Sequence, residues 1–202
     1  MNLIEKASII RYHRHRIAEF NDWTVKALGW KGEESQQKRF EVISSVGDFS
    51  NCSLLDVGCG YGDLKAYLDK KFSNFTYIGI DHMPEFIQES KVKYSQVANT
   101  HFLQADFAMV GLPEVDYVIA SGALGYRSND PDFYFRMIKK MYEAANKAFA
   151  FNMLDEELFI EHPLLVGHNF EKVVDFCKTL TPRVKVIKGY LADDFTVIMY
   201  RE

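Results

Sequence analysis

Three glycines at alternate positions, Gly58, Gly60 and Gly62, follow an apolar stretch that ends in Asp56 and Val57. Glycine alone combines a positive φ with a missing Cβ, so a ligand can lie directly against the backbone of such a turn. A helix beginning just after the turn would direct free N–H groups and its positive dipole end toward a carboxylate or phosphate. The motif therefore predicts a cofactor-binding turn with Asp56 as a fixed, negatively charged acceptor beside it.

The spacing of these glycines disfavours two common nucleotide motifs. A dinucleotide fingerprint needs its third glycine three residues after the second, and Asp63 stands at that position. A P-loop would end in Gly-Lys-Ser/Thr, which does not occur here. What remains is a small, cationic or zwitterionic nucleoside.

At these residues the sequence resembles the class I S-adenosylmethionine-dependent methyltransferases, whose first motif is an acid followed by Gly-x-Gly-x-Gly after the first strand. Asp56, Gly58, Gly60 and Gly62 match that motif, and an ordinary glycine-rich loop is the alternative. The resemblance implies a Rossmann-like α/β sandwich of three layers, with a mostly parallel seven-stranded sheet that ends in an antiparallel hairpin. It also implies S-adenosyl-L-methionine as the cofactor and methyl transfer as the activity.

Further cofactor contacts are implied for residues that follow the strands, because ligands of open parallel sheets bind beyond the carboxyl ends of the strands. Asp81 would accept the ribose hydroxyls, with a helix N-cap as the alternative. Asp106 would meet the adenine amino group, and Phe107 would stack on the purine or belong to the core. The predicted set also contains Cys59, His82, Met83, Ala105, Ser121 and Arg39, the last as a partner of the methionine carboxylate or as a surface ion pair.

No motif identifies the methyl acceptor. The Asn/Asp/Ser-Pro-Pro-aromatic tetrad of enzymes that methylate nucleic-acid amino groups is absent after Ala120, and no cysteine follows a proline as in cytosine C5 enzymes. A small-molecule acceptor is therefore the prediction. An RNA or protein methyltransferase and a noncatalytic S-adenosylmethionine-binding module are the alternatives, and aminopropyl transfer ranks low. Catalytic candidates at the expected mouth of the site are Tyr12, His15, Tyr126 and Asn152.

From Ser53 onward, short β-rich runs alternate with helical stretches, which is typical of a parallel sheet with helical crossovers. The predicted strands are Ser53–Val57, Phe75–Asp81, Thr100–Gln104, Val115–Ala120 and Lys147–Asn152, and the predicted helices span roughly 62–72, 83–94, 131–145 and 169–180. The last two β-rich runs, Arg183–Leu191 and Phe195–Arg201, are too close for a crossover, so they must form an antiparallel hairpin.

Two helices are predicted before the first strand, at about 3–23 and 33–46. In the first, an apolar stripe of Leu3, Ile10, Ile17 and Phe20 would lie opposite a polar face of Tyr12, His13, Arg14, His15 and Arg16. That polar face predicts either a dock for an acidic or phosphorylated substrate or a solvated surface. The two helices would either cover a sheet edge or close over the cofactor and build the substrate pocket.

The 202 residues carry a net charge of −4 with both signs mixed, which does not support a nucleic-acid partner. Three cysteines without a Cys-x-x-Cys pair, and six scattered histidines, predict neither disulfides nor a metal site. No apolar run approaches the roughly 18 residues of a membrane span. We expect a cytoplasmic monomer or weak dimer, in which an N-terminal helical cap (1–49) precedes the methyltransferase domain (50–202) as one compact unit.

Overall fold

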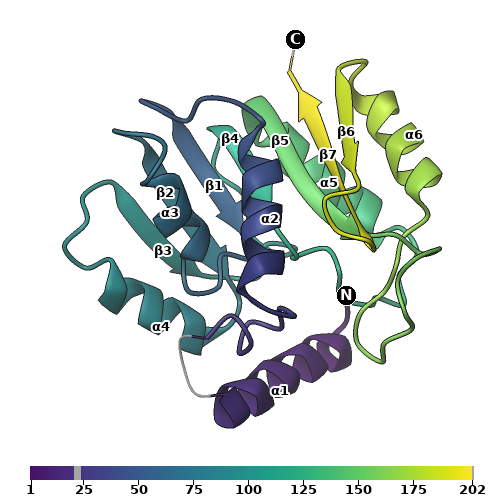
Figure 1. The fold of residues 1–202 in the computed structure, drawn as a ribbon, viewed down its shortest axis with the longest axis horizontal. Helices are drawn as coiled ribbons and strands as arrows, with labels where there is room; N and C mark the ends of the chain where they lie inside the picture. The colour runs from purple at the N-terminus through teal and green to yellow at the C-terminus, as the bar shows by residue number, and fades with distance from the viewer. Residues whose placement is uncertain (21–23, 202) are drawn as a thin grey trace.

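The computed structural model describes residues 1–20 and 24–201 and contains a single seven-stranded sheet with helices on both faces (Figure 1). The strand order is β3-β2-β1-β4-β5-β7-β6, so the chain reverses its direction of travel across the sheet between β1 and β4. The strands are β1 Ser53–Val57, β2 Thr76–Asp81, β3 Thr100–Gln104, β4 Val115–Ala120, β5 Ala145–Leu154, β6 Val184–Lys188 and β7 Asp194–Tyr200.

The first five strands are parallel, and β7 pairs antiparallel with both β5 and β6. The predicted terminal hairpin is therefore confirmed, and it places β7 inside the sheet with β6 at the edge. The bounds of β1, β3 and β4 agree with the sequence prediction. β5 is longer than predicted at both ends, because Ala145 pairs with Val115 of β4 at its start and pairing with β7 continues to Leu154 opposite Asp194.

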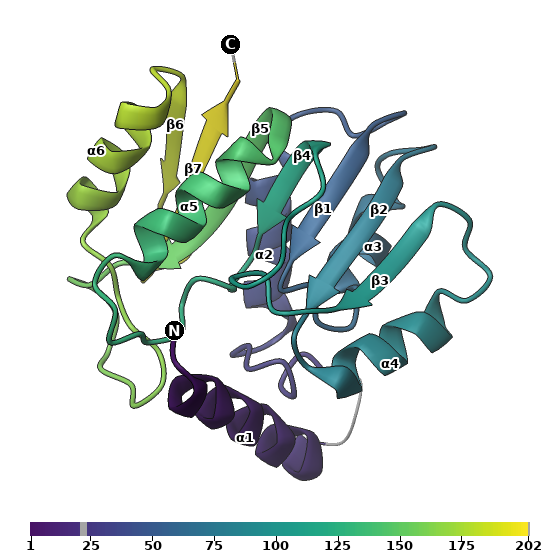
Figure 2. The same ribbon diagram turned by 180° about the vertical axis from the view of Figure 1, so that it is seen from behind.

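Helices cover the two faces of the sheet (Figures 1 and 2). On one face lie α2 Glu33–Ser44, α3 Asp63–Leu68 and α4 Pro84–Lys93, and on the other lie α5 Phe133–Glu143 and α6 Phe170–Leu180. Proline at the first position of α4 suits a helix start, since its missing N–H would have no partner there. Asn169 caps α6 by accepting the Lys172 N–H at 3.0 Å. The helices therefore begin where local chemistry favours it.

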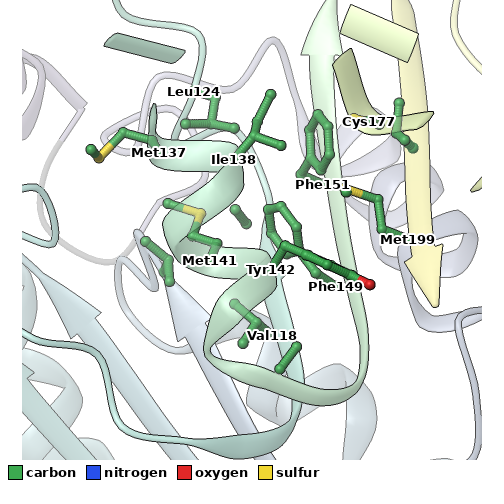
Figure 3. Packing of buried hydrophobic residues seen from close by; sticks show 14 of the residues in the cluster. Val118, Leu124, Met137, Ile138, Met141, Tyr142, Phe149, Phe151, Cys177 and Met199 are labelled. Carbon is green, nitrogen blue, oxygen red and sulfur yellow. The ribbon is translucent and has the colours of Figure 1, made fainter. Parts of the chain in front are cut away.

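The larger core cluster lies between α5, α6 and the central strands (Figure 3). Phe149 and Phe151 of β5 are fully buried and stack on each other with ring centroids 4.9 Å apart. Ile138 and Met141 of α5 pack beside them. Burying one such side chain contributes about 1.5–3 kcal/mol. This cluster holds β4 and β5 rigidly and so positions the loops at their carboxyl ends.

Helix α1, Leu3–Phe20, lies across the carboxyl edge of the sheet instead of on either face (Figures 1 and 2). Its predicted apolar stripe is partly wrong, because Leu3 is 82% exposed and the buried residues are Ile9 and His13. A histidine is tolerated inside because both of its ring nitrogens have hydrogen-bond partners. The predicted end of this helix near Trp23 lies outside the described residues.

Candidate active site

A cavity of about 400 Å³ lies between α1 and the carboxyl ends of the central strands. It is located where the strand order reverses between β1 and β4, the usual ligand position in an open α/β sheet. The loops after β1, β2, β3 and β4 contribute to its walls, together with α1, the segment 28–31, the start of α2 and the loop after β5. The N-terminal helices thus build the cavity, in addition to covering the sheet.

The glycine turn after β1 forms one wall of this cavity. Gly58 and Gly60 have φ angles of 78° and 53°, which favour glycine. A Cβ on Gly58 would lie 2.8 Å from the Cβ of Ala123, so a side chain would displace the loop after β4. The N–H groups of Gly58 and Cys59 both donate to the Ile80 carbonyl, at 2.8 and 3.2 Å, which ties the turn to β2. The turn is therefore open toward the cavity and rigid behind it.

Gly62 does not line the cavity, contrary to the sequence prediction. It has a φ of 73° and starts the short helix α3, and a Cβ there would lie 2.8 Å from the rings of Phe102 and Tyr94. The third glycine therefore serves the packing of the helix. Met83 is also absent from the lining, because its side chain is fully buried beside Tyr61.

Asp81 links the two turns that face the cavity. Its Oδ2 accepts the Gly60 N–H at 3.1 Å, and its Oδ1 accepts the Met83 N–H at 2.9 Å. The N-cap alternative is wrong, because Met83 is the N-cap residue of α4 and no side chain caps that helix. The bond from the Met83 N–H closes a turn just before α4. Each carboxylate oxygen can accept more than one hydrogen bond, so Asp81 keeps accepting capacity toward the cavity that it lines.

Asp56 is buried and accepts the hydroxyl proton of Tyr77. Burial, together with the nearby charges of Asp81 and Asp63, raises the pKa of Asp56 to about 7, although the Tyr77 hydrogen bond opposes the shift. Asp56 therefore titrates near neutral pH and does not hold the permanent negative charge that the sequence suggested.

Asp106 connects the loop after β3 to α1. It forms an ion pair with Lys6 at 2.5 Å and accepts the Ala108 N–H at 2.9 Å. Burial alone would raise the pKa of Asp106, but the Lys6 ammonium and the Ala108 N–H outweigh it and hold that pKa below its usual value. This ion pair fastens the N-terminal half of α1 at the end of the cavity nearest β3.

Arg39 lines the cavity but is not the surface ion pair considered as an alternative. It is buried, pairs with Asp194 of β7, and lies over the ring of Trp30 with its guanidinium carbon 4.8 Å from the ring centroid. Burial raises the pKa of Asp194 to about 6, although the Arg39 charge opposes the shift. The pair joins α2 to the antiparallel end of the sheet.

Asn152 braces the loop after β4. Its Oδ1 accepts the Gly122 N–H at 2.8 Å, and its Nδ2 donates to the Ser121 hydroxyl at 3.3 Å. A Cβ on Gly122, whose φ is 77°, would lie 2.7 Å from the ring of Trp30. Asn152 lines the cavity, but both ends of its amide hold the wall in place.

The catalytic candidates on α1 separate in the structure. Tyr12 lines the cavity, as does Tyr126 from the loop after β4. His15 does not: its side chain is 78% exposed and lies 3.9 Å from Glu19. Residues two positions apart on a helix face different directions, so burial of His13 turns His15 to the outside. The prediction that His15 lies at the mouth of the site is therefore wrong.

The cavity brings together most of the predicted cofactor residues. Those that line it are Asp56, Gly58, Cys59, Gly60, Asp81, His82, Ala105, Asp106, Phe107, Ser121 and Arg39. Several lining residues were not predicted: Leu28, Trp30, Gln36, Phe159 and Leu165. His13, predicted on a polar surface of α1, also lines the cavity. Gln36 donates a hydrogen bond to Asp63 at 3.2 Å. Its position as a polar residue on the buried side of a predicted helix was the feature of the sequence that could have identified it as a site residue. Phe159 and Leu165 lie in an irregular loop, which has no periodicity to reveal them.

Comparison with known proteins agrees with this geometry. Residues 54–147 match the family described as a methyltransferase domain. The chain is 27% identical to Rv1506c of Mycobacterium tuberculosis, a protein named as a methyltransferase. The similarity covers 78% of this chain and 96% of Rv1506c. Residues 54–147 form a methyltransferase domain. The match begins at β1 and ends near the start of β5, so the glycine turn, β2, β3 and β4 lie within this domain.

Two further relatives of this methyltransferase have different acceptors in their names. Trans-aconitate 2-methyltransferase from Enterobacter is 28% identical over 56% of this chain and 43% of its own length. The solved structure of magnesium protoporphyrin IX methyltransferase from Synechocystis, with bound S-adenosylmethionine, has a TM-score of 0.73 at 17% identity and covers 100% of this chain and 99% of that chain. The shared fold therefore does not identify the acceptor.

The described residues show neither a metal site nor a membrane span. They contain no group of three or more histidine, cysteine or acidic side chains arranged to hold a metal ion. Within the same part of the chain, no helix is both long and apolar enough to cross a lipid bilayer.

Proposed function

We propose that this methyltransferase transfers the methyl group of S-adenosylmethionine to a small molecule that binds in the cavity beneath α1. The observation that carries the proposal is the cavity itself, which has the open glycine turn and Asp81 on one side and residues of α1 on the other. Residues 1–49 would then act as a cap on the methyltransferase domain. Monomer or weak dimer, and a cytoplasmic location, stay predictions.

The residues of the cavity fit the chemistry of this cofactor. The backbone of Gly58 and Gly60 lines the cavity, and neighbouring side chains occupy the positions where a Cβ would project. Asp81 retains accepting capacity for the ribose hydroxyls. Asp106 would accept the adenine amino group while it holds Lys6. Arg39 would bind the methionine carboxylate with the guanidinium N–H groups that Asp194 leaves available.

When bound, the cofactor supplies a methyl group on a sulfonium, which is already a strong electrophile. The chain therefore has to align the acceptor and exclude water. Phe107, Trp30 and Phe159 give the cavity aromatic walls, and α1 shields one side. A site that is built on rigid strand ends and closed by packed side chains can both align the acceptor and exclude water.

The size and charge of the cavity favour a small acceptor that is not strongly anionic. Its volume of about 400 Å³ lies near the lower end for small-molecule sites, roughly 300–1,000 Å³, and the cofactor itself would occupy much of it. Within the described residues, each lysine or arginine of the lining pairs with a carboxylate: Lys6 with Asp106, Lys31 with Asp193, and Arg39 with Asp194. A polycarboxylate such as trans-aconitate would find no unpaired cation among them.

Arg14 and Arg16 of α1 do not favour a nucleic-acid dock. Arg14 donates to Glu85 at 2.6 Å, and Arg16 donates to the Lys26 carbonyl at 2.6 Å. Both guanidinium groups therefore serve contacts within the chain. The RNA-methyltransferase alternative gains no support from these contacts.

Calorimetric titration with S-adenosylmethionine and its demethylated product tests the cofactor site. We expect micromolar binding by the natural chain and at least a tenfold loss in Gly58→Ala, because the added Cβ meets Ala123. Gly111→Ala is the matched control, since nothing lies within 4 Å of its Cβ position. Absence of binding by the natural chain would refute the proposal, as would equal affinity of the two variants.

A further inference from the structure

His13 and Tyr126 meet inside the cavity, although 113 positions separate them in the chain. His13 Nε2 lies 2.6 Å from the Tyr126 hydroxyl oxygen, and Nδ1 lies 3.3 Å from the Ala27 carbonyl oxygen. A carbonyl only accepts hydrogen bonds, so Nδ1 must carry the proton of the neutral ring. Nε2 is then the acceptor, and the Tyr126 O–H donates to it.

This arrangement leaves the Tyr126 oxygen ready to accept a proton. Its own proton points to His13, so its lone pairs remain for a group in the cavity. The His13 ring is enclosed by aromatic edges, with Phe86 at 5.1 Å, Tyr12 at 5.2 Å and Tyr126 at 5.8 Å between centroids. These ring contacts fix the orientation of the imidazole, and its Nε2 faces the Tyr126 hydroxyl.

The charges around His13 suit a base that becomes positive only during the reaction. Burial lowers the pKa of His13, so the resting ring is neutral at physiological pH. Asp81 on β2 opposes that effect and favours the charged form, while His82 and Arg16 disfavour it. An imidazolium formed here would therefore be stabilised by the same carboxylate that we assign to the ribose.

We infer that Tyr126 and His13 together take the proton of the methyl acceptor, and that the acceptor is an uncharged molecule bearing a hydroxyl group. The inference rests on the proposed methyl transfer and adds the class of acceptor to it. Apolar walls that include Phe133 and Leu165, and cations that are already paired, favour an uncharged acceptor. A carboxylate acceptor would need neither a base nor this pair.

The atoms and charges of the step balance. The acceptor oxygen forms a bond to the methyl carbon as the carbon–sulfur bond breaks, and that bond's electron pair remains on sulfur as a neutral thioether. The acceptor proton moves to the Tyr126 oxygen while the Tyr126 proton moves to His13 Nε2. One positive charge disappears at sulfur and one appears on His13, near Asp81. Solvent then removes the proton from the imidazolium.

Two variants and one control test the pair. Tyr126→Phe removes the proton-accepting oxygen, and His13→Gln keeps an acceptor for Tyr126 and a donor for Ala27 but cannot become a cation. His101→Gln is the control, since His101 is an exposed residue of β3 outside the cavity. The assay follows label transfer from S-adenosylmethionine to a panel of phenols and alcohols, with size-matched carboxylic acids and amines beside them.

We expect label on the hydroxyl compounds, with kcat/KM about 100-fold lower in both pair variants, while cofactor affinity by calorimetry changes less than threefold. In the natural chain, nitrogen NMR at pH 7.5 should show His13 neutral with its proton on Nδ1. Label on carboxylic acids or amines alone, near-natural rates in His13→Gln, or a proton on Nε2 would overturn the inference. Those results leave cofactor binding intact, whereas absence of binding would overturn the proposed function itself.

Discussion

The buried pair of Arg39 and Asp194 yields a prediction whose size follows from the structure. Replacing Arg39 with methionine keeps much of the side-chain volume but leaves the Asp194 carboxylate, 3% exposed, without its cation. Breaking a buried ion pair on one side costs about 3–5 kcal/mol. We therefore expect Arg39→Met to lower the free energy of unfolding by that amount at pH 7.5.

The pH dependence of this loss distinguishes the ion pair from lost packing. Burial raises the pKa of Asp194 from 3.8 to about 6 even with Arg39 present, and removal of the arginine must raise it further. An acid whose pKa is raised on folding favours stability below its unfolded pKa and loses that contribution as pH rises through the folded value. A shift of about two units corresponds to about 3 kcal/mol in the natural chain. Most of the penalty in Arg39→Met should therefore vanish at pH 4.5, where Asp194 is protonated.

Urea unfolding at pH 4.5 and pH 7.5 measures both quantities. Asp194→Asn and the double variant complete a thermodynamic cycle, in which the double variant should be more stable than Arg39→Met at pH 7.5, because no buried carboxylate remains uncompensated. If Arg39→Met cost less than about 1 kcal/mol, or the same at both pH values, this account of the pair would be refuted.

Four further outcomes are expected. In Asp56→Asn, the gain in stability should be small below the unfolded pKa of 3.8, grow between pH 4 and 7 and be complete at pH 8, because burial raises the folded pKa of Asp56 to about 7; urea unfolding across this range checks it. Lys6→Met should cost under about 1 kcal/mol, since both partners are partly exposed, yet increase amide hydrogen exchange in α1. Phe149→Ala should cost about 3–5 kcal/mol in the same unfolding assay, because it opens a cavity in the fully buried core. Gly58→Ala should lose cofactor affinity whereas Gly111→Ala should not.

Local patterns in the chain predicted the fold well because each has a local physical cause. The central strands β1 and β4 are buried on both faces, so they appear as short apolar segments with clear ends. The edge strand β3 buries only Phe102 within it, and its bounds follow from the β-rich run alone. The short connection between the last two runs allowed only an antiparallel pair, and β6 and β7 form one. The same reasoning missed the true length of β5, because pairing with β7 extends it through residues whose neighbours come from far along the chain.

The cofactor side of the site was largely accessible from the sequence, and the acceptor side was not. Gly58, Gly60 and Asp81 follow directly from strand ends, and the strand-end rule places them at one edge. Gly62 shows the limit, since its conformation is required by packing against Phe102 instead of by the cavity. His15 shows it as well: spacing on a helix cannot say which of two nearby histidines faces inward.

The sequence by itself determined the class of fold, the turn and the family of the cofactor, because those depend on the order of strands and on residues close together in the chain. Only the tertiary structure decided that α1 crosses the carboxyl edge, that Arg39 pairs with Asp194, and that His13 meets Tyr126. The Arg39–Asp194 and His13–Tyr126 contacts each join residues more than a hundred positions apart in the chain. Burial decides which polar groups must find hydrogen-bond partners. The glycine turn thus points to the methyl donor, while the proposed acceptor site depends on the contacts of α1.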